Sequence, residues 1–528
     1  LLLAGSAVTA EKGATQLVAG QDVNILAVSN ADSARHERKE SKSSWGGLKS
    51  SKVQDKVDEK RTTAMGSMVS GETVTVAAKR DATVTGSSLV STGDLAVQAG
   101  RDLTIDGAQN TFARTDMHKE KNRDLTGVLT GNKLGLDDMT GNQKLYINSS
   151  KHNGTANEMT LTGSTIGSSA GNVSLTAGRE LKVVASDLVS TKNMELSGAN
   201  VTVTSGMETA SQTSKDSSKS LAVGRVIAGT VVDTANSIRD AAEAARSSDD
   251  PRLKAVKIAQ AALSMYNLNN QAGELAKQST GFKDKTGGSV GNGSFIKIGT
   301  ELANTRTKNS SEYTAQTAHQ SNLNAGGKLS IIATGDAPGT VGDLTITGST
   351  LKADSTLLSA KNNILMQSAQ NTTDRKNDGS RNRTAIGASF NIGEQNGFTI
   401  DLGAQTAKNL GSGGSVTQVN TTLDTGSLVL RSGQDTSLIG AQVRADRIDA
   451  NIGGNLNILS RQDTETSRSK QNSAGFGASI CIPPICYGSP VTASANLAAS
   501  KMNSDYQAVT DQSGFFAGKG GYLSLIHI

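Results

Sequence analysis

The chain has 528 residues, of which 57 are glycine and only 3% are aromatic. A globular enzyme of this length usually carries more aromatic side chains to fill its core, so the composition favours a repeat array built from stacked small aliphatic residues. The net charge of +5 is small for this length and argues against a dedicated nucleic-acid binder, and no apolar run approaches the ~20 residues that span a bilayer.

The first repeats are expected over residues 1–204. The stretch 93–107 reads GDLAVQAGRDLTIDG, in which apolar and polar residues alternate and glycine ends each run. This period of two predicts short strands with one buried face, and a buried side made by Leu95, Val97, Leu103 and Ile105. Gly100 is expected to turn the corner, because glycine readily adopts a positive φ. The opening LLLAG is too short for a signal peptide.

Related stretches recur along the chain with the grammar G-[SA]-x-apolar, a strand, and then [AG]-G-x-[DN]-apolar-x-apolar. They lie at 5–30, 86–110, 163–187, 348–371 and 440–463. Short strands joined by tight turns in a recurring unit predict an all-β fold, a right-handed parallel β-helix (solenoid). An antiparallel sandwich is the main competitor, and the small inward residues favour the β-helix.

Charged, polar excursions separate the repeats, and each leads into a glycine-containing apolar strand. They lie at 34–48, 113–131, 373–393 and 464–484. We interpret them as β-hairpins that project from the solenoid, either as solvated loops without a role or as an interaction surface. The candidate interaction residues are Arg114, Lys119, Lys121, Arg375, Lys376, Arg381, Arg383, Arg468 and Lys470.

A longer insertion is expected over residues 205–320, with a helical pair at about 221–278. Val226, Val231 and Ala235 begin an imperfect helical face, and Asp250 followed by Pro251 would start the second helix. Two interpretations remain open for this α-helical insertion. It packs on itself or on the solenoid, or it docks a partner or contacts a membrane.

The repeats resume over residues 321–521, and this part contains both cysteines of the chain. Cys481 and Cys486 flank Ile-Pro-Pro-Ile, a spacing that allows a local disulfide in an oxidising compartment. The tail 522–528 does not fit the repeat pattern and is interpreted as an atypical end or an artefact.

The sequence contains no recognisable catalytic or cofactor motif, so the chain is predicted to be non-enzymatic, without metal or cofactor. The histidines have no metal-ligand spacing; they are His36, His118, His152, His319 and His527. A polysaccharide-cleaving β-helix would need grouped carboxylates, and a β-helix could align Asp81, Asp94, Asp102 and Asp106. The recurrence of aspartate at one place in almost every repeat favours a turn role instead.

The repeats of the form GSxVxA…AGxDVxI, the excursions, the segment DDPRLKAVKIAQAALSMYN and the stretch GFGASICIPPICYG together resemble the hemagglutinin repeats of filamentous hemagglutinins. The resemblance is strongest to the large exoproteins of contact-dependent growth inhibition, and it covers roughly residues 1–521. It implies export by two-partner secretion through an outer-membrane transporter, a place at the bacterial cell surface, and contact with a target-cell or host-cell receptor that is a protein or a glycan. It also implies support for delivery of a C-terminal toxin absent from this chain. A host-cell adhesin is the alternative.

Overall fold

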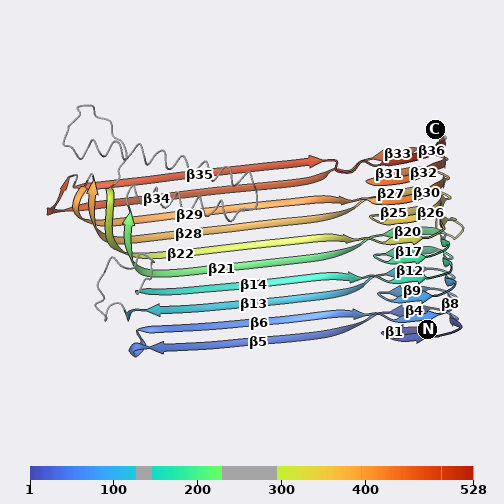
Figure 1. The fold of residues 1–528 in the computed structure, drawn as a ribbon, viewed down its shortest axis with the longest axis horizontal. Coiled ribbons are helices and arrows are strands. Elements are labelled where there is room, and N and C mark those ends of the chain that lie inside the picture. Colours follow the sequence, from blue (N-terminus) through green and yellow to red (C-terminus); the bar gives the residue numbers. More distant parts are fainter. Residues whose placement is uncertain (127–144, 229–293, 394, 489, 527–528) are drawn as a thin grey trace.

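The computed structural model describes residues 1–126, 145–228, 294–393, 395–488 and 490–526. In this part of the chain, short strands pair in parallel from coil to coil, and long strands pair antiparallel beside the coils (Figure 1). The prediction of a parallel β-helix with projecting hairpins is therefore confirmed against the sandwich alternative, and the right-handed sense stays a prediction.

The coil has three sides, and each side is a stack of parallel strands. The first side consists of β1 (Leu2–Ala4), β4 (Val23–Leu26), β9 (Ala82–Thr85), β12 (Leu103–Asp106), β17 (Glu180–Val184), β20 (Asn200–Thr204), β25 (Leu344–Thr347), β27 (Ile364–Gln367), β31 (Thr436–Ile439) and β33 (Leu456–Leu459). The second side begins with β2 (Ala7–Thr9), β7 (Met68–Gly71), β10 (Ser88–Ser91), β15 (Thr165–Ser168), β18 (Asp187–Ser190) and β23 (Asn322–Ala325). The third side begins with β3 (Ala14–Ala19), β8 (Thr73–Ala78), β11 (Leu95–Ala99), β16 (Val173–Ala177), β19 (Met194–Gly198) and β24 (Lys328–Ala333). In the later coils, one longer strand spans both the second and the third side. These strands are β26 (Thr350–Ala360), β30 (Thr421–Ser432), β32 (Ala441–Ile452) and β36 (Gly514–Ile526).

The core lies inside this triangular coil and is made of aliphatic side chains from alternate strand positions. Leu95, Val97, Leu103 and Ile105 are at most 1% exposed, as predicted. The prediction that Gly100 turns the corner through a positive φ is wrong, because this residue is not among those with a positive φ. A Cβ on Gly100 would lie 2.1 Å from the carbonyl oxygen of Lys79 in the preceding coil, so close stacking requires glycine there.

The corner between the first and second sides is tight in every second coil. Its first residue has a left-handed conformation, with φ +55° at Gly86 and, unusually for a residue with a side chain, φ 45° at Ala185. A serine follows and is buried. The hydroxyl of Ser87 donates to the carbonyl of Thr85 (2.9 Å) and accepts from the N–H of Ser67 in the neighbouring coil (3.0 Å). The G-[SA] start of the repeat is therefore a corner that satisfies its own backbone groups.

In the alternate coils the same corner opens into a long hairpin. The hairpin strands are β5 (Val28–Ser44) and β6 (Lys49–Met65), β13 (Ala108–Asp124) and β14 (Tyr146–Thr162), β21 (Gly206–Ala228) and β22 (Ser294–His319), β28 (Ala369–Gly393) and β29 (Gln395–Val419), and β34 (Asp463–Gly488) and β35 (Val491–Ala508). The short 3-10 helix η1 (Trp45–Gly47) forms the turn of the first hairpin.

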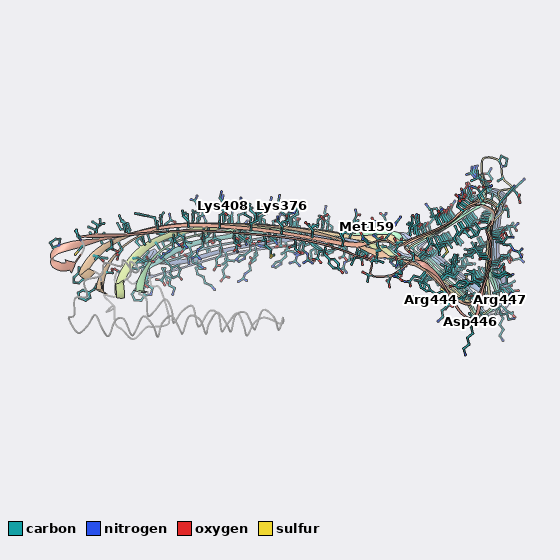
Figure 2. All side chains as sticks on the ribbon, turned by 90° about the horizontal axis from the view of Figure 1, so that it is seen from above. Met159, Lys376, Lys408, Arg444, Asp446 and Arg447 are labelled. Carbon is teal, nitrogen blue, oxygen red and sulfur yellow. The ribbon has the colours of Figure 1, made fainter. Side chains whose placement is uncertain are left out.

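The hairpins pair with one another and form a single antiparallel sheet, which we call the hairpin sheet. In the described part of the chain its order is β35-β34-β29-β28-β22-β21-β14-β13-β6-β5, ten strands in all. Neighbouring strands are about 4.8 Å apart in any sheet, so two coils rise by about the width of one two-stranded hairpin. This equality of spacing lets every hairpin meet the next in continuous register. Figure 2 shows the hairpin sheet as a thin layer that extends from the coil.

The prediction of a helix that begins at about residue 221 is wrong for residues 221–228. These residues continue β21 and pair antiparallel with β22, where Leu221 faces Asn304 and Val223 faces Leu302. The sheet ladder gives their backbone groups partners, and this tertiary pairing overrides a weak helical pattern. The remaining residues of the predicted helical pair, 229–278, lie outside the described residues. The tail that departs from the repeat grammar is a strand as far as Ile526, because β36 pairs in parallel with β32.

Candidate functional site on one face of the hairpin sheet

The strand registers divide the side chains of the hairpin sheet between its two faces. Residues directly opposite each other on antiparallel strands point to the same face, and neighbours along a strand point to opposite faces. Each register pair therefore extends a row across the sheet, and successive rows alternate between the faces. We call the two faces the lysine face and the paired face, according to the charges described below.

The lysine face carries two neighbouring rows of cations. One row contains Lys39, Lys119, Lys151, Lys308 and Lys408, and the other contains Lys52, Lys121, Lys219 and Arg306. We call these residues the basic stripe. Along the ten described strands, neither row contains an aspartate or glutamate. The stripe runs across the strands, parallel to the axis of the coil.

The cations of the basic stripe are exposed and mostly without acidic partners. Lys39 pairs with Glu37 (2.7 Å), and the other members of the stripe have no described carboxylate within ion-pair distance. Lys119 lies directly opposite Lys151, and the same holds for the pairs Lys52–Lys121 and Lys219–Arg306. Like charges placed directly opposite each other destabilise a sheet. The stripe therefore has an electrostatic cost that the fold alone does not explain.

Several cations surround an open depression of about 550 Å³ in the middle of the lysine face. Lys151, Lys308 and Lys408 of the stripe line it together with Lys215 and Asp378 of the adjacent row. Figure 2 shows Lys376 and Lys408 on the same side of the sheet.

Beyond the stripe, towards the hairpin tips, the lysine face becomes apolar. Val223, Leu302, Ile386 and Leu402 lie directly opposite one another on β21, β22, β28 and β29 and form what we call the apolar row. Their side chains are 37%, 42%, 51% and 40% exposed, respectively. Neighbouring rows of this face add exposed side chains, namely Ile147, Leu221, Ile400 and Ile480. Large exposed apolar patches mark surfaces that bind another molecule.

The paired face has a different composition at the same heights. Opposite the apolar row it carries small residues, namely Ala222, Ala303, Ala385 and Gly403. Several of its cations have acidic partners, as in Arg114–Glu59 (3.2 Å) and Arg383–Glu301.

A histidine on the paired face is held between two carboxylates. His152 contacts Asp216 (2.6 Å) and Asp116 (2.9 Å) from the two flanking strands. The hydrogen bond to Asp216 raises the pKa of His152 above its usual range. The two faces therefore differ in how their charges are compensated.

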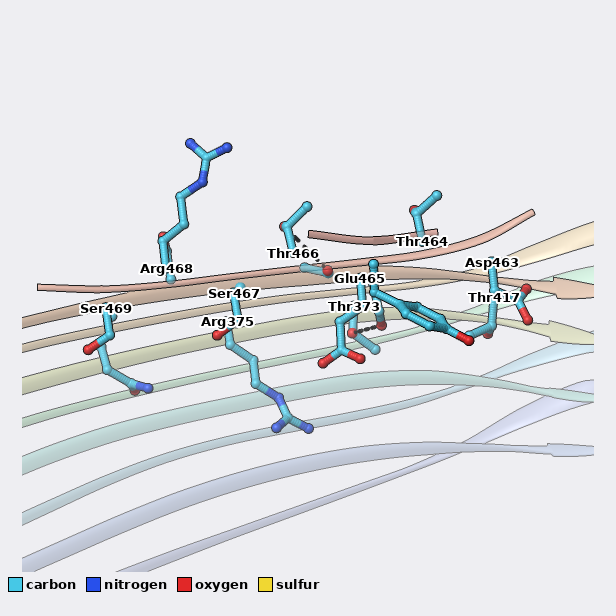
Figure 3. A pocket seen from close by; sticks show the side chains of 17 residues that line it. Thr373, Arg375, Thr417, Asp463, Thr464, Glu465, Thr466, Ser467, Arg468 and Ser469 are labelled. Atoms are coloured by element: carbon cyan, nitrogen blue, oxygen red, sulfur yellow. Dashed lines mark hydrogen bonds between the residues drawn. The ribbon is translucent and has the colours of Figure 1, made fainter. Parts of the chain in front are cut away.

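The candidate residues predicted from the sequence are divided between the two faces. Lys119, Lys121, Lys376, Arg468 and Lys470 lie on the lysine face, and Arg114, Arg375, Arg381 and Arg383 lie on the paired face. Figure 3 shows Arg468 and Arg375 pointing to opposite sides of the sheet. Arg375 packs over the ring of Tyr313 at 5.4 Å, which gives it a structural contact.

Sequence reasoning missed seven of the nine stripe residues and all of the apolar row. The missed cations are Lys39, Lys52, Lys151, Lys219, Arg306, Lys308 and Lys408. Their alternation with small polar residues, as in Arg306-Thr-Lys308, was the available signal, but their assembly into rows depends on the register between hairpins.

Of the aspartates considered for a polysaccharide-cleaving site, Asp81 and Asp102 lie at corners between the third and first sides, Asp94 lies at a corner between the second and third sides, and Asp106 ends β12. Asp81 binds Arg101, and Asp102 binds Arg179, in each case through both oxygens. Each also accepts from a backbone N–H of the next coil. Arg179 lowers the pKa of the Asp102 carboxyl. Asp94 accepts from Asn172 (3.0 Å), and burial raises the pKa of Asp106, whose carboxylate accepts from the N–H of Gly107.

Cys481 is buried and disulfide-bonded. The register of β34 against β29 jumps from Cys481 opposite Thr399 to Cys486 opposite Gly397, so the residues between the cysteines form a bulge. The side chain of Cys486 lies outside the described part of the chain, and its pairing with Cys481 stays a prediction.

Among the described residues, no group of three or more histidine, cysteine, aspartate or glutamate side chains has a metal-binding arrangement. In the same ranges, no helix is long and apolar enough to cross a membrane.

Comparison with known proteins gives one family and a set of long relatives. The hemagglutinin repeat family matches residues 1–122, 145–250 and 302–474. The deoxyribonuclease CdiA of Dickeya dadantii is 33% identical over 97% of the chain, and the tRNA nuclease CdiA of Escherichia coli STEC_O31 is 33% identical over 98%. The 16S rRNA endonuclease CdiA of Enterobacter cloacae is 32% identical over 96%. The chain spans only 14–15% of the length of these relatives. No solved structure matches it significantly.

Proposed function

Since the chain belongs to the hemagglutinin repeat family, we propose that it is a non-enzymatic, cell-surface part of a secreted exoprotein of contact-dependent growth inhibition. In this proposal the coil is a stiff stalk, and the hairpin sheet is the surface that meets the target cell. Export would use the outer-membrane transporter of two-partner secretion, as the family implies.

One observation carries the assignment of a structural and contact role. The hairpin sheet has an extended face with cations that lack described acidic partners, next to exposed apolar side chains. Such a face needs a partner, because exposed apolar patches and opposed like charges weaken a free protein.

The relatives support a non-enzymatic role for this region. Their names assign cleavage of DNA, tRNA and 16S rRNA, although each of them matches nearly the whole length of this chain. A region shared by proteins with different nuclease substrates is not expected to determine the substrate. We therefore place toxin activity in the remainder of such a protein, and assign delivery and contact to this part.

A chimaeric exoprotein tests the proposal. The matched region of the Dickeya dadantii relative is replaced by this chain, and DNA degradation in co-cultured recipient bacteria is measured. The chimaera should support degradation, and a chimaera whose hairpins are replaced by tight Gly-Ser corners should be displayed on the donor surface but lose it. Equal DNA degradation by both chimaeras would contradict a contact role for the hairpin sheet.

The alternative is a host-cell adhesin without toxin delivery. The same resemblance to filamentous hemagglutinins motivates it. Labelled purified chain that adsorbs to epithelial cells but not to bacteria would favour this alternative.

A further inference from the structure

We propose that the lysine face of the hairpin sheet docks flat on an anionic lipid surface, with the basic stripe at the lipid phosphates and the apolar row in the headgroup region. This inference rests on the proposed contact with a target cell, and it names the chemistry that the hairpin sheet contacts. It assigns docking to one face of the sheet only.

The arrangement of charge and apolar side chains on the same strands supports this assignment. Along β21, Lys219, Leu221 and Val223 occupy alternate positions and so share the lysine face. On β22, Leu302 lies four residues from Arg306. The apolar row is therefore about 14 Å from the nearest row of the stripe. Proteins that lie in a membrane interface combine these two features, apolar side chains at the acyl boundary and lysines at the phosphates.

The unpaired charges have a role in this arrangement. The opposed pairs Lys119–Lys151 and Lys219–Arg306 destabilise the free sheet, and dense phosphates would neutralise both members of each pair. The stripe consists almost entirely of lysine. Lysine is a strongly hydrated point charge without the bidentate geometry of arginine, so it suits a surface whose phosphates have no fixed arrangement. Docking would thus relieve the repulsion that the folded chain maintains.

Other polyanions fit the face less well. A single-stranded nucleic acid is bound by aromatic side chains between the cations, and the two rows of the stripe contain none along the described strands. A soluble acidic polysaccharide would leave the apolar row in water. A lipid surface is the partner that satisfies both the stripe and the apolar row.

Vesicle sedimentation with the purified full chain tests the charge requirement. The chain should bind vesicles that contain an anionic phospholipid, bind vesicles of a zwitterionic phospholipid much more weakly, and be released by salt. Replacement of four stripe residues (Lys119→Gln, Lys151→Gln, Lys308→Gln, Lys408→Gln) should weaken binding at least about tenfold. The matched control removes the same charge from the paired face (Arg38→Gln, Lys42→Gln, Lys49→Gln, Arg381→Gln) and should weaken it much less.

The stripe variant should also be more stable than the parent chain, because it removes the repulsion within Lys119–Lys151. A higher melting temperature together with weaker binding would separate a binding role from a folding defect. Equal weakening by the two variants would overturn the assignment to one face.

Fluorescence can test the docked face directly, because Trp45 is the only tryptophan of the chain. In a Trp45→Phe background, Ile386→Trp places a reporter on the lysine face, and Ala385→Trp places one on the paired face at the same height. Anionic vesicles should shift the emission of the Ile386→Trp variant to the blue and leave that of the Ala385→Trp variant unchanged.

Each other outcome overturns the docking proposal. Shifts in both reporters would mean that the sheet enters the lipid rather than lying on it. No shift in either, or displacement of the chain from vesicles by a soluble polyuronate at equal charge, would mean that lipid is not the partner. None of these results bears on toxin delivery by the chimaera, so the two proposals fail separately.

Discussion

At the scale of single residues, the tight corner of the coil depends on where one methyl group is placed. At Gly86, Gly348 and Gly5 the left-handed residue is a glycine, and a Cβ there would lie within 2.4 Å of a side-chain carbon of the residue that starts the next hairpin. At Ala185 the methyl group is present, and the residue that starts the next hairpin is Gly206. A Cβ on Gly206 would lie 2.8 Å from that of Ala185 and 2.4 Å from Cδ1 of Leu161, which is the end of a flexible side chain. The two positions therefore share the space for one methyl group.

This exchange predicts strong coupling between the two positions. Ala185→Gly should stabilise the chain by about 1 kcal/mol, because a non-glycine residue in the left-handed region costs about that much. Gly206→Ala should destabilise it by about 1–3 kcal/mol through overpacking, and the double variant should recover the part of the loss that comes from the contact with Ala185. Denaturant unfolding of the four chains measures the cycle, and additive effects would contradict the shared space.

His152 predicts a pH dependence on the paired face. Its folded-state pKa is raised by Asp216 and Asp116, so its contribution to stability is complete below the unfolded value and is lost as pH rises through the folded value. The melting temperature should therefore fall as pH rises above about 6.5. His152→Gln should remove this fall, and a profile unchanged by the substitution would show that another group titrates.

At the scale of elements, the sequence predicts strands well and their partners poorly. The alternation at Leu95, Val97, Leu103 and Ile105 is a local property, and the structure confirms it. The excursions are confirmed as hairpins for the same reason. Their fusion into one sheet depends on the relation between coil rise and strand spacing, which no local pattern contains.

The candidate surface could be predicted only in part for the same reason. Within one strand, odd and even positions point to opposite faces of the sheet. This alternation places Arg114 and Lys119 on different faces, and likewise Arg375 and Lys376, and it was present in the sequence. The meeting of Lys119 with Lys151, or of Val223 with Leu302, requires the registers between strands. The helix expected from residue 221 failed because the pairing of β21 with β22 was invisible to a single-segment pattern.

The position of a hairpin within the sheet predicts the cost of losing it. Replacing β5–β6 with a tight Gly-Ser corner removes an edge hairpin and leaves the remaining strands paired. Replacing β28–β29 in the same way opens a gap between β22 and β34. These two strands would then lie about two strand spacings, or 9.6 Å, too far apart to pair. The central excision should therefore destabilise the chain more. Amide hydrogen exchange should show new unprotected edges at β22 and β34 only in the central variant; equal exchange in both variants would contradict the continuous sheet.

At the scale of the whole molecule, the unit of construction is two coils and one hairpin. Deleting residues 86–184 removes one complete unit and joins Thr85 to the corner residue Ala185, so both the coil and the hairpin sheet should remain continuous. Deleting residues 164–185 removes a single coil and brings two hairpins within one coil rise of each other, about 4.8 Å, where four strands compete for the space of two.

The larger deletion should therefore be the better tolerated one. We expect cooperative unfolding for the chain that lacks residues 86–184, and aggregation or a broad transition for the chain that lacks residues 164–185. The reverse order of stability would contradict the two-coil unit.

The unequal charge of its two faces also gives the hairpin sheet a tendency to bend. Repulsion along the lysine face expands that side, while the ion pairs of the other face resist expansion, so the sheet gains a tendency to bow with the lysines on the outside of the curve. Figure 2 shows a gentle bow with Lys376 and Lys408 on the convex side. Counterions that neutralise the lysines would relax this stress, and the curvature of the sheet would then report the ionic environment that surrounds it.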